Sequence, residues 1–136
     1  MSEYIEHDRD SVSVGIVEKK LYTFAEPPNE MVLECGAKLG PVTLAYETYG
    51  TLNENKSNVV LILHALSGDS HVAGYYKAED EKPGWWDNMV GPGKGIDTNK
   101  YFVVCSNSFG SCMGSIGPCT INPESPSVIW LKPRKH

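Results

Sequence analysis

The sequence lacks the features that mark membrane, secreted and nucleic-acid-binding proteins. Its 136 residues contain no apolar run near the roughly 20 residues that cross a bilayer. The polar and acidic stretch from Met1 to Asp10 does not have the pattern of a signal peptide. Basic residues are scattered and the net charge is -5, which argues against nucleic acid or an anionic membrane as a partner. These absences together predict a cytoplasmic protein of ordinary globular composition.

The four cysteines lack the spacing of the usual metal sites. Of the four cysteines, three follow one another at intervals of seven residues, which matches no common zinc pattern. A disulfide framework would suit a small secreted protein, but no export signal is visible. We therefore expect reduced thiols and no metal. The cysteines are Cys35, Cys105, Cys112 and Cys119.

The most informative pattern in the chain is one stretch, Asn58 to Asp69. Five apolar residues, Val59 to Leu63, run directly into His64 and a short turn of small and polar residues. A short apolar run rich in β-branched residues and bounded by turn residues predicts a fully buried strand of a parallel sheet. In such sheets the loops beyond the carboxyl ends of the strands carry the chemistry. The loop after Leu63 is therefore the first candidate site.

The rest of the chain predicts strands and very little helix. Ile16 to Phe24, Met31 to Glu34 and the alternating Val42 to Tyr49 predict an antiparallel meander, the last of them with unlike faces as at a sheet edge. Cys35 to Pro41 is expected to be a turn. Tyr101 to Cys105 predicts a second buried strand, and one short helix fits Trp85 to Val90. The predicted class is α/β, with an antiparallel meander that leads into a parallel sheet and with few of the helices that should cover it.

The loop His64-Ala65-Leu66-Ser67-Gly68 allows two readings. A turn of small residues after a buried strand can point a backbone N–H at a developing oxyanion, and Leu66 is then the donor. The alternative is a turn that uses small residues only for packing. His64, Asp69 and His71 do not have the spacing of a helical zinc pair, so a metal site or charge relay is not favoured. The chain contains no G-x-S-x-G elbow that would activate a serine.

Several blocks in order strongly resemble homoserine O-acetyltransferases. They are V-T-L-A-Y-E-T-Y-G-T-L-N at Val42 to Asn53, H-A-L-S-G-D-S-H at His64 to His71, P-G-W-W-D-N-M-V-G-P-G-K at Pro83 to Lys94, D-T-N-K-Y-F-V-V-C-S-N at Asp97 to Asn107, and G-P-C-T-I-N-P at Gly117 to Pro123. The resemblance covers Ile16 to Pro123. It implies the N-terminal portion of an α/β-hydrolase fold in the homoserine and serine O-acyltransferase group. Residues 1–15 would be a flexible leader and residues 124–136 a divergent tail from a shifted frame or early stop.

The resemblance also implies chemistry. Family members pass an acetyl group, or a succinyl group in relatives, from coenzyme A to the hydroxyl of homoserine in methionine biosynthesis, by a ping-pong Ser-His-Asp mechanism. By resemblance, His64, Ala65, Ser67 and Gly68 form the active-site loop, Leu66 gives the oxyanion-hole N–H, and Asn107 lies near the active-site entrance. Acetyl-CoA and homoserine are the implied small-molecule substrates, with no bound cofactor, and the full-length family is commonly homodimeric.

The family's serine, aspartate and histidine lie downstream of the blocks that this chain contains. The resemblance therefore predicts no acyl transfer by this chain alone and marginal folding with an aggregation-prone sheet edge. Two other functions remain open: a fragment of a related esterase or thioesterase, and a non-catalytic half that pairs with a separate C-terminal half. The choice between acetyl and succinyl donors, and between homoserine and serine acceptors, is also open.

Overall fold

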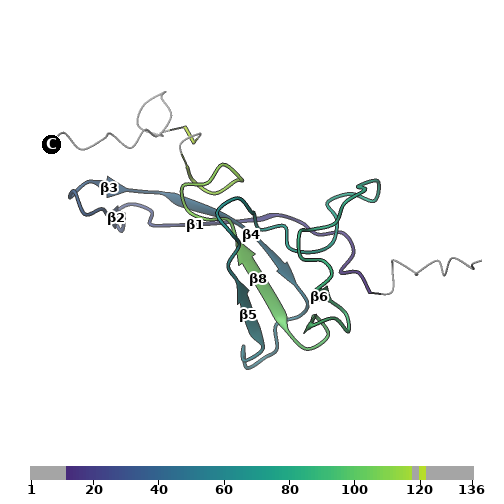
Figure 1. Cartoon of the computed structure of the whole chain (residues 1–136). Coiled ribbons are helices and arrows are strands. Elements are labelled where there is room, and N and C mark those ends of the chain that lie inside the picture. The colour runs from purple at the N-terminus through teal and green to yellow at the C-terminus, as the bar shows by residue number, and fades with distance from the viewer. Residues whose placement is uncertain (1–11, 118–119, 122–136) are drawn as a thin grey trace, which may run out of the picture. The chain divides into compact units, whose positions relative to one another are not determined.

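The computed structural model describes residues 12–117 and 120–121, which form eight strands and no helix (Figure 1). The predicted poverty in helix is therefore confirmed for the described residues, and none of them belongs to a helix that could cross a membrane. Most of the expected leader, the tail at 124–136 and Cys119 lie outside these residues. The strands are β1 (Lys20–Phe24), β2 (Met31–Val32), β3 (Lys38–Leu39), β4 (Val42–Tyr49), β5 (Val59–Ile62), β6 (Val90–Gly91), β7 (Ile96–Asp97) and β8 (Phe102–Ser106).

Four strands form the main sheet, in the order β1-β4-β8-β5. β1 pairs with β4 in antiparallel fashion, and β5 pairs with β8 in parallel (Figure 1). The sequence therefore predicted correctly that antiparallel strands lead into a parallel sheet, but the expected strand at Met31 to Glu34 is not part of it, because β2 pairs with β3 in a separate sheet. The chain forms two compact units. The first holds Glu47–Leu63, Ser70–Cys105 and the described residues before Lys19, and the second holds Lys19–Tyr46, His64–Asp69 and the described residues after Cys105.

The first unit contains the apolar core. Side chains from β5, β8 and the segment after the candidate loop pack together, and Val14, Val60, Trp86 and Ile96 pack against them partly buried. Alternation along β8 is regular, because Val103 and Cys105 are fully buried and their neighbours are not. The core residues are Val17, Tyr49, Ile62, Val72, Ala73, Val90, Val103 and Cys105.

Two sequence predictions about the sheet were wrong. β5 is not buried on both faces: Val59 is 49% exposed and Leu61 62% exposed, while Ile62 is buried. β5 ends the order of the described sheet, and only one of its faces packs against the core. β4 is not an edge strand, because it lies between β1 and β8. A period of two shows that the faces of a strand differ, but it does not say how many neighbours the strand has.

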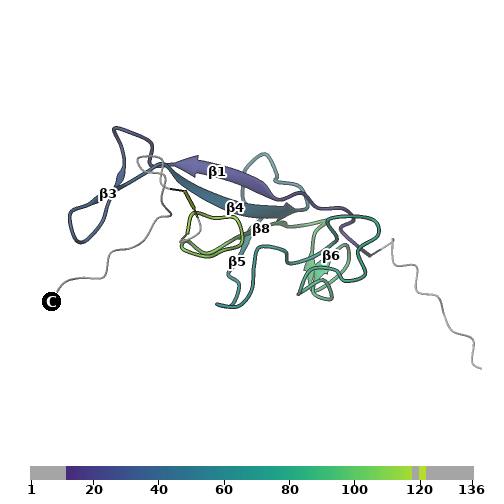
Figure 2. The same cartoon turned by 90° about the horizontal axis from the view of Figure 1, so that it is seen from above.

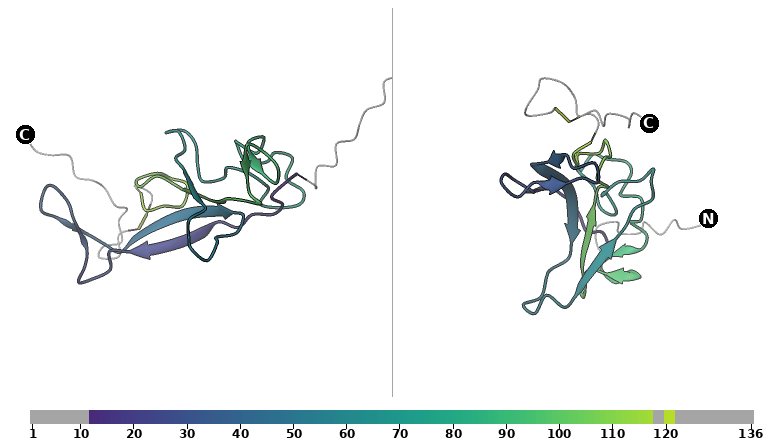
Figure 3. Two further views of the ribbon diagram at one scale, coloured as in Figure 1. Left: turned by 90° about the horizontal axis from the view of Figure 1, so that it is seen from below. Right: turned by 90° about the vertical axis from the view of Figure 1, so that its left-hand side faces the viewer.

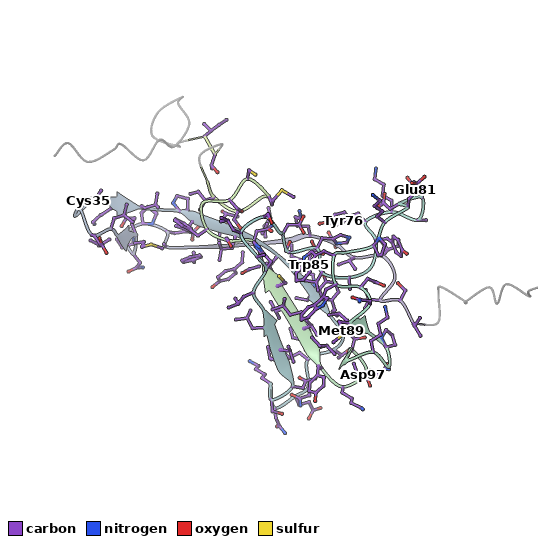
Figure 4. All side chains as sticks on the ribbon, in the orientation of Figure 1. Cys35, Tyr76, Glu81, Trp85, Met89 and Asp97 are labelled. Carbon is purple, nitrogen blue, oxygen red and sulfur yellow. The ribbon has the colours of Figure 1, made fainter. Side chains whose placement is uncertain are left out.

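The second unit is built on the antiparallel pair of β1 with the first part of β4, which lie side by side in opposite directions (Figure 2; Figure 3, left). A smaller hairpin joins β2 to β3, and Cys35 lies at its turn (Figure 4). β3 lies within the stretch expected to be only a turn. The backbone N–H of Leu33 donates to the Ala37 carbonyl at 2.8 Å, and this closes the hairpin.

The short helix expected at Trp85 to Val90 does not form. Successive turns run from Trp85 to Met89, and Val90 then begins β6, which pairs in parallel with β7. Between Trp85 and Val90, one backbone bond has helical i to i−4 spacing, from the Val90 N–H to the Trp86 carbonyl at 3.1 Å. The glycine-rich and proline-containing segment after Val90 stops propagation, because glycine and proline are the poorest helix formers.

Candidate functional site

The loop after β5 folds as a tight turn. The Gly68 N–H donates to the Ala65 carbonyl at 2.8 Å, which leaves Leu66 and Ser67 at the tip. The Leu66 side chain is fully exposed. A Cβ on Gly68 would lie 3.3 Å from both the Ala65 oxygen and the His64 Cβ, so glycine suits the tight closure. The sequence placed this turn correctly from its small residues.

Leu66 presents a free backbone donor at this tip. Within residues 12–117 and 120–121, the Leu66 N–H donates no hydrogen bond. An exposed amide in a turn can donate to an anionic oxygen, as an oxyanion hole requires. The geometry is therefore compatible with the predicted role of Leu66, which stays a prediction.

His64 joins this loop to the loop after β8. Its Nδ1 lies 2.7 Å from the Ala65 carbonyl oxygen, and its Nε2 lies 3.1 Å from the Ser108 backbone nitrogen. A carbonyl only accepts and a backbone N–H only donates, so the pair of contacts assigns the proton to Nδ1. The Ser108 hydroxyl is more distant from Nε2, at 3.4 Å.

Asn107 anchors the loop after β8 from inside. It is 1% exposed, its N–H donates to the Ala45 carbonyl at 2.8 Å, and its side-chain amide donates to the Met113 carbonyl at 2.6 Å. The buried Ser115 hydroxyl donates to the Asn107 carbonyl and accepts from the Ala45 N–H, both at 3.0 Å. The backbone and the side chain of Asn107 are thus both used in shaping this loop. Its predicted place at an active-site entrance is not tested by these contacts.

A buried carboxylate in the first unit was not singled out from the sequence. Glu47 is 0% exposed, and its two oxygens accept four side-chain hydrogen bonds. Oε1 accepts from the Ser70 hydroxyl at 3.1 Å and the Tyr76 hydroxyl at 2.8 Å. Oε2 accepts from the Tyr49 hydroxyl and His71 Nδ1, both at 3.0 Å. We call these five residues the Glu47 cluster.

The cluster stabilises the ionised carboxylate. Burial alone would raise the pKa of Glu47, but hydrogen bonds from His71, Tyr76 and Tyr49, together with the charge of His71, outweigh it and hold the pKa below its ordinary value. Burial and then the charge of Glu47 raise the pKa of Tyr49, so its phenol stays protonated as a donor. The His71 ring also stacks on Tyr76, with centroids 4.0 Å apart.

The sequence carried a signal for this cluster. Alternation along β4 put Glu47 on one face with Ala45 and Tyr49, and that face is buried. A carboxylate among apolar neighbours needs a partner, because a bare buried charge is very costly. The sequence did not predict which residues supply that partner, because His71 and Tyr76 lie 24 and 29 positions further along the chain.

Other candidate groups have structural partners. Among the described residues, no three His, Cys, Asp or Glu side chains gather as metal ligands. Cys35, Cys105 and Cys112 are not joined in disulfide bonds. Lys94, from the glycine-rich segment, pairs with Asp87 at 2.9 Å. The described part of the chain thus offers a backbone donor at Leu66, and no serine in it is part of an elbow motif.

Comparison with known proteins finds relatives that are named as homoserine O-acyltransferases. No model of a known protein family matches the chain. The chain is 60% identical over 125 residues to the homoserine O-acetyltransferase of Solidesulfovibrio magneticus, a match that covers 92% of this chain and 32% of that protein. It is 58% identical over 113 residues to the homoserine O-succinyltransferase of Psychrobacter arcticus, covering 83% and 25%.

Solved structures agree with the sequence matches. The homoserine O-acetyltransferase of Bacillus anthracis superposes with a TM-score of 0.72 at 44% identity, and esterase E22 with 0.72 at 37% identity. Each match covers 83% of this chain and 31% of the other. The chain is therefore a relative of the homoserine O-acetyltransferases in sequence and of the α/β-hydrolases in fold, and its matches cover a quarter to a third of the length of these relatives.

Proposed function

We propose that the chain is the N-terminal part of a homoserine O-acetyltransferase. The observation that carries the proposal is 60% identity maintained over 92% of the chain. In the whole enzyme, a serine outside this chain takes the acetyl group from the sulfur of acetyl-CoA and frees the coenzyme A thiol. The homoserine hydroxyl then takes the acetyl group from the serine, which regenerates the enzyme. The whole enzyme is cytoplasmic and homodimeric.

In this reaction the chain supplies one half of the oxyanion hole. The Leu66 N–H, exposed at the tip of the turn, donates to the oxyanion of each tetrahedral intermediate. The rest of the loop, His64, Ala65, Ser67 and Gly68, shapes the turn, and Asn107 fixes the neighbouring loop near the active-site entrance. The chain alone transfers no acetyl group, because nucleophile, base and oxyanion donor must lie within hydrogen-bond reach of one another.

A chimera tests the proposal. The matched segment of the Solidesulfovibrio magneticus protein is replaced by this chain, and coenzyme A release from acetyl-CoA is measured with and without homoserine. We expect homoserine-dependent release by the chimera and none by this chain alone. A soluble chimera that releases coenzyme A at the same rate with and without homoserine would contradict the proposal.

Replacement of one amide tests the role of Leu66 within that chimera. Leu66→Pro removes the N–H, and proline suits the second position of a β-turn. Loss of one oxyanion donor lowers kcat by roughly 100- to 1,000-fold. Leu66→Ala keeps the N–H and should leave kcat within a few-fold of the parent. Equal activity of the two variants would remove Leu66 from the oxyanion hole.

The same assay separates the alternatives. Similarity to esterase E22 at an equal TM-score makes ester hydrolysis the second candidate. Hydrolysis of a p-nitrophenyl ester without any homoserine dependence would favour it. Similarity to a homoserine O-succinyltransferase makes succinyl-CoA the second donor to compare. The third alternative is that the chain is a non-catalytic half that pairs with a separate C-terminal half. Co-expression of this chain with the remaining part of the relative, as a separate polypeptide, tests it in the same assay of coenzyme A release.

A further inference from the structure

One peptide bond connects His64 to the proposed oxyanion donor. The Ala65 carbonyl oxygen accepts from His64 Nδ1 at 2.7 Å and from the Gly68 N–H at 2.8 Å. In a trans peptide the C=O and N–H groups point in opposite directions. The carbonyl that His64 and Gly68 hold inside the turn belongs to the same peptide as the Leu66 N–H. That N–H is therefore directed away from the turn, where no described residue accepts it.

The histidine ring is itself held from its other side. The Ser108 N–H donates to Nε2 at 3.1 Å, which leaves the single proton of the neutral ring on Nδ1. The ring is thus both an acceptor from the loop after β8 and a donor to the loop after β5. A chain of hydrogen bonds runs from Ser108 through His64 to the Ala65 carbonyl, and each bond polarises the next.

We propose that His64 is a positioning residue that aims the Leu66 N–H by holding the Ala65–Leu66 peptide from its carbonyl side. The significance for catalysis rests on the proposed function, but the positioning is a property of this chain. The tautomer of the His64 ring and the orientation of the Leu66 N–H are therefore measured on the chain itself. A negative result in these measurements is then distinct from an inactive chimera.

His64 and Ser108 could instead have a catalytic role, in which His64 activates the Ser108 hydroxyl as a nucleophile. The Ser108 hydroxyl lies 3.4 Å from Nε2, which is longer than the 3.1 Å of the backbone N–H to the same atom. Neutral imidazole has one lone pair at Nε2, and the backbone N–H has the better geometry for it. The observations therefore favour positioning, and the nucleophile becomes an outcome of the test.

The experiment is NMR on the isotopically labelled 136-residue chain, carrying Leu61→Lys to limit its self-association. Long-range nitrogen–proton correlation of the His64 ring should find the proton on Nδ1. A scalar coupling across the hydrogen bond should connect the Ser108 amide nitrogen with His64 Nε2. A ring protonated at Nε2, or no coupling in the presence of a well-resolved Ser108 amide, would overturn the proposal.

Three variants separate the roles. His64→Leu removes both contacts, and we expect it to change the residual dipolar coupling of the Leu66 N–H and to speed Gly68 amide exchange by roughly 10-fold or more, as loss of about 1.4 kcal/mol of local stability would. His64→Asn can still donate to the Ala65 carbonyl and should restore both values. Ser108→Ala keeps the backbone N–H and should keep the coupling to Nε2. Loss of that coupling in Ser108→Ala would assign the contact to the hydroxyl and overturn the proposal.

The variants also control for unfolding. Amide shifts of Glu47 to Tyr49, which belong to the other unit, report whether each variant stays folded. If His64→Leu does not fold, the tautomer and the coupling in the chain that retains His64 still decide. An unchanged Leu66 coupling in a folded His64→Leu chain would reject the positioning role.

Discussion

At the scale of single residues, the chain depends on buried polar side chains that are satisfied by internal hydrogen bonds. Glu47 is the clearest case, because a fully buried carboxylate accepts two hydrogen bonds on each oxygen. The four donors come from Tyr49 on the same strand and from the segment that begins at Ser70. The cluster therefore ties β4 to a segment that has no regular secondary structure of its own.

Glu47→Gln should destabilise the chain strongly. Glutamine replaces one carboxylate oxygen with an NH2 group, whose two N–H donors then face groups that also donate. The charge interaction with His71 is lost as well. Loss of one partner from a buried, hydrogen-bonded pair costs about 3 kcal/mol. The free energy of unfolding is measured by urea denaturation, with exposed Glu54→Gln as the control. A Glu47→Gln chain as stable as the Glu54→Gln chain would contradict the prediction.

The same pair of chains has a predictable pH dependence. Because the pKa of Glu47 lies below its ordinary value of 4.5, its contribution to stability is complete above that pH. The contribution is lost as pH falls through the lower pKa of the folded state. The stability difference between the parent and Glu47→Gln should therefore shrink at acid pH and be constant from about pH 5 to 6. A difference that grows on acidification would mean that the pKa is raised instead.

At the scale of elements, turns hold the structure where helices are absent. The segment from Ser70 to Gly74 packs within the first unit because glycine allows close approach. A Cβ on Gly74 would lie 2.5 Å from the Gly15 carbonyl oxygen and 2.7 Å from methyl groups of Val14 and Val17. These contacts tie residues near the start of the described chain to the segment after the candidate loop.

Gly74→Ala should therefore cost more than Gly93→Ala. Both glycines have left-handed backbone, with φ of +71° and +69°, so both substitutions carry roughly 1 kcal/mol of backbone strain. Only Gly74 is crowded, and overpacking adds about 1–3 kcal/mol, whereas nothing lies within 4 Å of a Cβ on Gly93. Thermal melts of the two variants check this. Equal losses would show that space at Gly74 is not limiting.

At the scale of the whole molecule, the chain leaves apolar surface open. Val59, Leu61 and Leu63 are 49%, 62% and 81% exposed along and just after β5, at the end of the described sheet. Exposed apolar side chains on an edge strand favour association with other chains. The relatives it matches are about three times as long, since the chain covers 32% of the first of them. We expect the chain by itself to self-associate.

Leu61→Lys should reduce that association. A lysine on an edge strand opposes strand pairing between molecules, and Leu61 is already largely in solvent. Light scattering against protein concentration should rise later for Leu61→Lys than for the parent, with a similar melting temperature. Val32→Lys, at a side chain 66% exposed on β2, is the matched control. An equal benefit from Val32→Lys would attribute the effect to charge alone.

The sequence by itself determined the local elements and the place of the candidate loop. β4 begins and ends as predicted, because alternation and the flanking Pro41 and Gly50 define it locally. The turn at Ala65 to Gly68 also results from local residue types. The same local rules misjudged β5 and the helix at Trp85 to Val90. Burial depends on the residues that pack against a segment, and helix propagation depends on the residues that come after it.

Only the tertiary structure decided which distant groups meet. The Glu47 cluster joins residues up to 29 positions apart, and His64 meets Ser108 across 44 positions. Periodicity gives the face on which a side chain lies, but strand order and loop path decide its partner, and both depend on long-range pairing. The sequence thus predicted the turn at whose tip Leu66 lies, and the fold decided that His64 contacts both this turn and the loop after β8.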